Sequence, residues 1–166
     1  LYVPPALEFT PFIYTPLYYV VAAPLVAALG PGFLPLRLVS LLAASVLLVL
    51  IYLLVSRETG DRLAGLVAVG LFAATFRRGG AWFDVARVDS LSLVLLVATI
   101  YLVRRHRSTA GAVAAGVLLG LSFLTKQVAV SIAAPVIVWL AVTRFGRAVV
   151  LGLAAAAVVL PTMAVL

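Results

Sequence analysis

The sequence contains no cysteine, a single histidine and few charged residues. Without cysteine the chain forms neither disulfide bonds nor a thiolate metal site. The single histidine, His106, lies in a basic turn, so neither a histidine metal cluster nor a Ser-His-Asp arrangement can be assembled. Charged residues make up 10% of the chain, whereas soluble domains contain about 25%. This scarcity of charge argues against a soluble domain.

Hydrophobic residues are abundant instead and make up 66% of the 166 positions. They form seven apolar stretches separated by short glycine, proline or charged turns. A membrane-spanning helix needs about 20 apolar residues, so the third to fifth stretches are short for a complete crossing. We predict an all-α, polytopic membrane helical bundle that forms a single transmembrane domain over residues 1–166, with no soluble domain. The expected segments are 15–29, 36–56, 63–76, 89–103, 111–124, 127–143 and 148–166.

The basic residues divide unevenly if these segments alternate across a membrane. Seven fall on one side and five on the other, and the positive-inside rule assigns the larger set to the cytoplasm. Basic clusters between apolar runs are typical of topology signals and lipid contacts, so no nucleic-acid partner is expected. The cytoplasmic set is Arg57, Arg62, Arg104, Arg105, Arg107, Arg144 and Arg147, and the outer set is Arg37, Arg77, Arg78, Arg87 and Lys126.

Asp89 opens the fourth segment, in the stretch ARVDSLSLVLLVATIYLV, and an ionised group there needs support. Its simplest role is a helix N-cap that accepts hydrogen bonds from backbone N–H groups. A second interpretation places the preceding loop, RRGGAWFDVARVDS, around a water-filled cavity or ligand path. Asp84 and Arg87 are three residues apart and would pair if that loop were helical. The two roles of Asp89 are compatible, and both stay open.

Lys126, the only lysine, interrupts the apolar run GLSFLTKQVAV. Its ammonium can reach the membrane interface by snorkelling, or it can bind a phosphate as a point charge. Arg77, Arg78 and Arg87 share its predicted outer face. A lipid phosphate at the outer leaflet would satisfy all four cations.

Two further patterns point to structure rather than chemistry. Tyr14, Tyr18 and Tyr19 near the first segment fit an aromatic belt at the membrane interface. The stretch GVLLG at 116–120 is a small-xxx-small pattern that lets two helices approach closely. We assign it no functional role.

Two other function classes remain open. In a secondary transporter or lipid flippase, Asp89 and Lys126 would be coupling or substrate charges on broken helices. However, both charges sit at segment ends, and the chain has no visible internal repeat. A purely structural membrane subunit is the other class, and it predicts that the outer bases can be neutralised without consequence.

Four stretches resemble, in order and spacing, the polyprenyl-phosphate-dependent membrane glycosyltransferases of the GT-C superfamily. They are YTPLYYVVAAPLVAALG, LRLVSLLAASVLLVLIYLLVSRETGDRLAGLVAVGLFAA, ARVDSLSLVLLVATIYLVRR and GLSFLTKQ. The most similar groups are the dolichyl-phosphate-mannose protein mannosyltransferases and the aminoarabinose lipid A transferases. The resemblance matches Asp89 to an aspartate that starts a helix after the second outer loop. It also matches Lys126 to the lysine of an LTK segment, and Pro16 and Leu17 to a proline turn.

This resemblance implies transfer of a sugar from a polyprenyl-phosphate-linked donor to a lipid, protein or cell-envelope glycan. The reaction would take place at the extracytoplasmic face of a bacterial or archaeal plasma membrane, with membrane lipids as further partners. Asp89 would have a supporting catalytic role. The substrate-binding residues expected beside it are Arg87, Lys126, Arg77, Arg78 and Asp84.

The chain also departs from the family pattern. The family's principal catalytic acid lies in a loop expected before Leu1, so we expect an N- and C-terminally truncated fragment that is inactive alone. A Glu-Lys pair found in some relatives is replaced by Ile13 and Tyr14, which argues against a metal site of that type. A divalent cation elsewhere stays open as a cofactor.

Overall fold

The computed structural model describes residues 14–81 and 84–165 and is helical throughout these ranges apart from the connecting turns. Seven helices follow one another as predicted, and their ends differ from the predicted ends by at most three residues. The helices are α1 (Leu17–Leu29), α2 (Phe33–Thr59), α3 (Arg62–Ala74), α4 (Asp89–Arg105), α5 (Thr109–Phe123), α6 (Ala129–Thr143) and α7 (Phe145–Val165).

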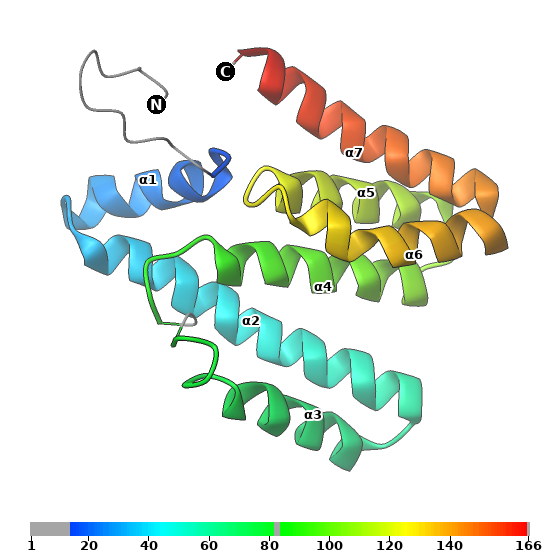
Figure 1. The fold of residues 1–166 in the computed structure, drawn as a ribbon, viewed down its shortest axis with the longest axis horizontal. Helices are drawn as coiled ribbons and strands as arrows, with labels where there is room; N and C mark the ends of the chain where they lie inside the picture. The colour runs from blue at the N-terminus through cyan, green and yellow to red at the C-terminus, as the bar shows by residue number, and fades with distance from the viewer. Residues whose placement is uncertain (1–13, 82–83, 166) are drawn as a thin grey trace.

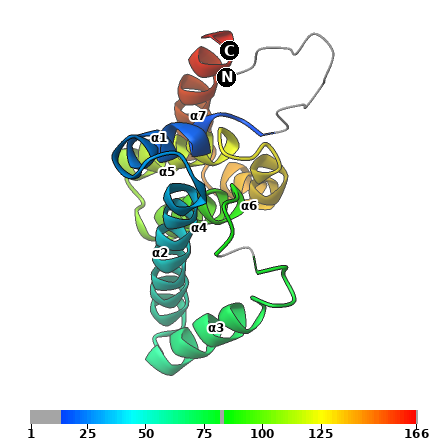
Figure 2. The same cartoon turned by 90° about the vertical axis from the view of Figure 1, so that its left-hand side faces the viewer.

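The helices pack as a stack in which α4 is central (Figure 1). One side of α4 packs on α2 and another on α5, while α7 covers α5. At the ends of the stack, α1 packs on α2, and α6 lies against α7, α5 and α4. Figure 2 shows α3 at the edge, beside α2 and away from α5 and α7. This order leaves the first turn of α4 close to helices from both halves of the chain.

Local sequence signals explain where the helices begin and end. Gly30 and Gly60 follow α1 and α2 with φ values of 83° and 74°, a backbone region that glycine enters without strain. The Asp61 carboxylate accepts from Leu63 N at 2.8 Å and caps α3. The Ser108 hydroxyl accepts from Gly111 N at 3.1 Å and caps α5 in the same way. These turns are short, as the sequence predicts.

The surface of the helices is largely apolar. Leu34, Leu153 and Leu160 are 61% to 67% exposed, which is a composition suited to lipid contact. α2, with 27 residues, and α7, with 21, are long and apolar enough to cross a membrane. The other apolar helices are shorter, so the seven crossings stay a prediction.

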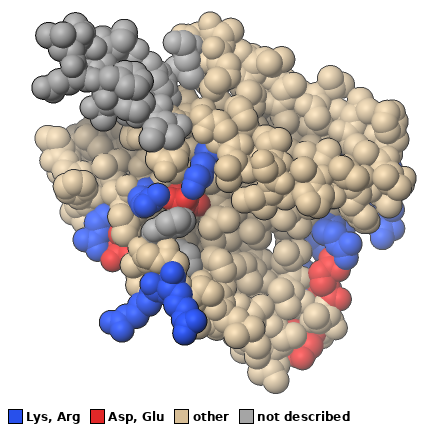
Figure 3. Space-filling view, viewed as in Figure 1, with Lys and Arg blue, Asp and Glu red and all other residues tan. Residues whose placement is uncertain are grey.

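Charged side chains gather at two separate places on the stack (Figure 3). One place surrounds the start of α4, where Asp89, Arg87 and Lys126 meet. The other surrounds the end of α4, where Arg104 binds Glu58. The predicted outer and cytoplasmic sets of bases therefore contribute to different ends of α4.

The small-xxx-small pattern in α5 is the contact point with α7. A Cβ added to Gly116 would collide with the carbonyl oxygen of Leu151, and one added to Gly120 would lie 3.0 Å from that of Ala155. Glycine is therefore required for the backbones of α5 and α7 to approach this closely. The pattern has a packing role.

We predict that Gly116→Ala lowers the free energy of unfolding by about 1–3 kcal/mol, because the added methyl group overpacks the α5–α7 contact. Gly152→Ala is the matched control, since a Cβ there meets nothing within 4 Å. That variant should be neutral or slightly stabilising, because alanine favours helix over glycine. Thermal unfolding in detergent measures both. Equal effects of the two substitutions would contradict the packing role.

Candidate functional site

Asp89 is the first residue of α4 and is only 6% exposed. A carboxylate in the first helical turn is stabilised by the positive end of the helix dipole. The N-cap position itself is occupied by Val88, and no side chain caps the helix there. The N-cap interpretation of Asp89 is therefore wrong in detail, because its carboxylate binds cationic side chains instead.

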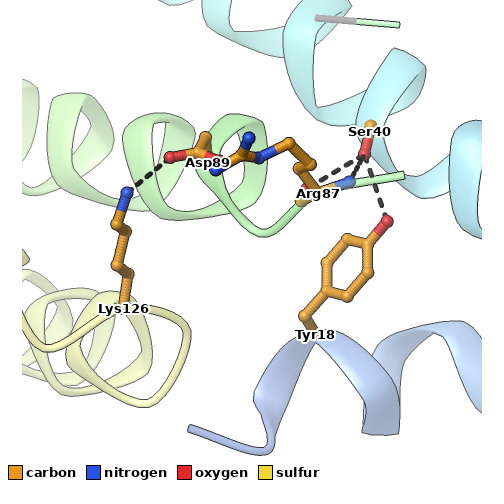
Figure 4. Close-up of polar contacts among 5 residues, drawn as sticks. All are labelled: Tyr18, Ser40, Arg87, Asp89 and Lys126. Atoms are coloured by element: carbon orange, nitrogen blue, oxygen red, sulfur yellow. Dashed lines mark hydrogen bonds and ion pairs between the residues drawn. The ribbon is translucent and has the colours of Figure 1, made fainter. Parts of the chain in front are cut away.

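Two cations hold the Asp89 carboxylate (Figure 4). Lys126 Nζ lies 2.6 Å from Oδ1, and Arg87 Nε lies 3.1 Å from Oδ2. The side chain of Asp89 is 7% exposed, whereas those of Lys126 and Arg87 are 26% and 38% exposed. The acid is thus buried beneath two cations that still reach the surface. Ion pairs with this degree of burial need both partners, since an unpaired buried charge is costly.

Lys126 is positioned by the turn that follows α5. Its backbone N–H donates to the carbonyl of Ser122 at 2.9 Å, and the Ser122 hydroxyl donates to the carbonyl of Ser92 in α4 at 2.9 Å. The Lys126 ammonium also lies 5.8 Å from the centre of the Tyr14 ring, within cation–π range. The Lys126 ammonium therefore pairs with Asp89 while its side chain stays 26% exposed, and its role as a phosphate ligand stays a prediction.

The proline turn before α1 is tied to the same place. Thr15 Oγ1 donates to the carbonyl of Phe123 at 2.9 Å, and Leu17 N donates to that of Leu124 at 2.9 Å. Both acceptors precede the turn that carries Lys126. The turn containing Pro16, which the family resemblance singled out, thus fixes the chain next to the ammonium.

Arg87 is positioned by two residues that the sequence analysis did not assign to the site. The Ser40 hydroxyl in α2 donates to the Arg87 carbonyl at 3.1 Å and lies 3.2 Å from the Tyr18 hydroxyl. Tyr18 also donates to the carbonyl of Leu36 at 2.8 Å. Tyr18 and Ser40 are 2% and 0% exposed, so Tyr18 does not belong to an interfacial belt. A polar residue within an otherwise apolar helix, as at Ser40, was the signal that could have revealed this link.

A cavity of about 500 Å³ opens beside Asp89, between the end of α3 and the start of α4. Arg78 and Asp89 both line it, so two predicted site residues share one cavity. Arg77 lies in the same turn and is exposed, but it does not line the cavity. The remaining lining residues are Phe72, Thr75, Phe76, Gly79, Gly80, Ser90 and Leu93.

Asp84 has a different partner from the one expected. Arg37 Nη2 lies 2.7 Å from both carboxylate oxygens of Asp84, and the residues between Asp84 and Asp89 are not helical. The expected Asp84–Arg87 pair is therefore not formed. Asp84 pairs with Arg37 instead, and Arg87 pairs with Asp89. The Arg37–Asp84 pair is exposed, with side chains 50% and 42% accessible.

The side chains around Asp89 do not fit a divalent ion. Both Asp89 oxygens are bound to cations, and no group of three His, Cys, Asp or Glu residues gathers within the described ranges. Cations that already neutralise the carboxylate leave it a poor ligand for a second positive charge. Ile13, one of the two residues that stand in place of the Glu-Lys pair of some relatives, lies outside the described residues.

A buried carboxylate that pairs with two cations thus lies beside a cavity, at one end of a stack of apolar helices. The sequence model of the family described as dolichyl-phosphate-mannose-protein mannosyltransferase matches residues 14–166, and the chain belongs to this family. The resemblance drawn from the motifs is thereby confirmed. Membership identifies a GT-C-type membrane glycosyltransferase in general terms and gives no support to a transporter. No curated protein and no solved structure matches the chain significantly.

We predict that Asp89 and Lys126 are energetically coupled. A double-mutant cycle of Asp89→Asn and Lys126→Met should give a coupling free energy of about 1–3 kcal/mol in unfolding measurements, because the pair is largely withdrawn from solvent. The cycle of Arg37→Gln and Asp84→Asn is the matched control and should give about 0–1 kcal/mol. A coupling no larger in the first cycle than in the second would contradict a structural role of the buried pair.

Proposed function

We propose that this chain forms the part of a membrane glycosyltransferase that binds the phosphate of a polyprenyl-phosphate-linked sugar donor. The sugar would pass to a lipid, protein or cell-envelope glycan at the extracytoplasmic face. One observation carries the proposal: Asp89, which lines a cavity of about 500 Å³ together with Arg78, pairs with Arg87 and Lys126. These two cations are not part of the cavity lining and adjoin it through Asp89. Membership in the mannosyltransferase family supports a donor of this kind.

In this proposal Arg87 and Lys126 bind the donor phosphate, and Arg78, which lines the cavity with Asp89, adds a third cation. A guanidinium has five N–H donors and an ammonium three, so each can bind a phosphate oxygen and keep its contact with Asp89. Asp89 is then a positioning residue, because it acts through the two cations. Arg77, exposed in the turn that carries Arg78, would add to the positive potential.

The reaction would be a direct displacement at the anomeric carbon of the donor. The acceptor oxygen forms a bond to that carbon while the bond from carbon to the phosphate oxygen breaks. The electron pair of the broken bond stays on the released polyprenyl phosphate, and the acceptor's proton passes to a general base. Positive groups that are already in place stabilise the charge that grows on the phosphate.

The distribution of bases supports an extracytoplasmic site. The end of α4 that carries Asp89 is near the smaller set of bases, whereas the larger set includes the arginines at its other end. The positive-inside rule places the larger set in the cytoplasm. The donor phosphate would therefore be bound on the outer side of the membrane.

We predict that Lys126→Ala lowers the rate of sugar transfer by about 100-fold, because a preorganised cation that stabilises the leaving phosphate is lost. Lys126→Arg should restore part of the rate. The measurement is transfer of radiolabelled sugar from polyprenyl phosphate donors by the intact protein reconstituted in liposomes. Asp89→Asn should lower kcat more than it raises KM, because the cations stay but lose their alignment.

Arg37→Gln is the matched control, since it removes a cation from the same end of the helical stack. Arg37 pairs with the exposed Asp84 and not with Asp89. It should retain most of the transfer rate. If Lys126→Ala and Asp89→Asn also retain it, the site proposal fails. Transport of a labelled lipid without any sugar transfer would instead support the transporter class.

A further inference from the structure

A second cluster of charges lies at the opposite end of α4 from Asp89 (Figure 3). Because α4 has 17 residues, the two clusters are about 25 Å apart. At this far end the last turn of α4, the next turn and the α6–α7 junction surround a hollow of about 430 Å³. We call it the arginine hollow, and the five arginines that line it are Arg104, Arg105, Arg107, Arg144 and Arg147.

One acid and one carbonyl group engage two of these arginines. Glu58, at the end of α2, lies 3.1 Å from Arg104 Nε and 2.5 Å from Arg104 Nη2. Arg147 Nη2 donates to the carbonyl of His106 at 2.6 Å. The Nε of Arg147 is buried and has no hydrogen-bond partner among the described residues. One of the arginines that line the hollow therefore carries a buried donor for which the described residues supply no acceptor.

The other three arginines increase the excess of positive charge. Within residues 14–81 and 84–165, no ion pair includes Arg105, Arg107 or Arg144. Five guanidinium groups facing one carboxylate repel one another unless a further anion is present. At the other end of α4, by contrast, a buried carboxylate sits between the cations.

We propose that the arginine hollow binds the phosphate headgroup of an anionic membrane lipid. A phosphate has several acceptor oxygens, and guanidinium groups bind it through paired N–H donors. Such a group would neutralise part of the excess positive charge of the arginines in the two turns. This inference does not depend on the proposed transfer reaction.

The surroundings of the hollow favour a lipid over a soluble phosphate. Trp139 lines it, and the Arg104 guanidinium lies 5.6 Å from the centre of its ring. Val142 and Phe145, close by in the chain, are 82% and 72% exposed. Tryptophan beside exposed apolar residues is typical of the membrane interface. The acyl chains of a lipid would thus contact the exposed apolar side chains while its headgroup contacts the arginines of the hollow.

The test is lipid retention by the full chain in detergent, measured by native mass spectrometry with phosphatidylglycerol and phosphatidylcholine as probes. We expect phosphatidylglycerol to bind at least about tenfold more tightly, because both lipids carry a phosphate but the quaternary ammonium of phosphatidylcholine cancels its charge and is repelled by the arginines. The double variant Arg105→Gln/Arg144→Gln should abolish the preference. The matched control Arg57→Gln/Arg62→Gln removes two arginines that do not line the hollow and should keep it.

Three results of the retention experiment would overturn the proposal. One is equal retention of the two lipids by the wild-type chain. Another is equal loss of the preference in both double variants, which would indicate general surface charge. The last is displacement of phosphatidylglycerol by inorganic phosphate at the same concentration, which would indicate a soluble anion.

The melting temperature of the wild-type chain provides a second test if the Arg105→Gln/Arg144→Gln variant does not fold. This Tm should rise when phosphatidylglycerol is added and stay unchanged with phosphatidylcholine, because a ligand that binds the folded state stabilises it. No rise with phosphatidylglycerol overturns the proposal.

Discussion

The arrangement of this protein depends on neutralising one buried carboxylate at the start of α4. Asp89 is 6% exposed, and a lone charge at that depth would be costly because it loses its contact with water. Lys126 supplies one cation from the turn after α5, and Arg87 supplies the other from the loop before α4. Each cation is in turn held by a different part of the chain. The ion pairs therefore join segments that hydrophobic packing alone would leave free to slide.

Hydrogen bonds connect Arg87 and Lys126 to different helices. Through Ser40 and Tyr18, the backbone of Arg87 is fixed to α2 and α1. Through Ser122, the backbone of Lys126 is fixed to α5, which hydrogen bonds to α4. Apolar helices offer few directional contacts, so these polar links determine the relative positions of the helix ends. A site at the start of α4 is thus preorganised by the same contacts that hold the fold.

The helices could be predicted from the sequence, but the partners of the charged residues could not. Hydropathy is a local property, so the apolar runs and their glycine breaks located all seven helices within three residues at each end. Ion pairs depend on tertiary proximity. Asp84 binds Arg37, which is 47 residues away, although Arg87 is much closer in sequence. The burial of Tyr18 also depends on tertiary contacts and could not be predicted. In the sequence alone, an aromatic residue near a helix start is equally consistent with an interfacial belt.

The length of α4 explains why both of its ends need charge partners. Its 17 residues extend about 25 Å, whereas the hydrocarbon core of a bilayer is about 30 Å thick. If α4 crosses the membrane, its two ends lie near the edges of the hydrocarbon core, where a short side chain such as that of Asp89 reaches less far toward water than a long one such as that of Arg104. Pairing Asp89 with Lys126 and Arg87, and Arg104 with Glu58, lowers the cost of holding charge at that depth. The cations beside Asp89 would then lie at the edge of the hydrocarbon core, which is where the function proposed above needs the phosphate of a lipid-linked donor to bind.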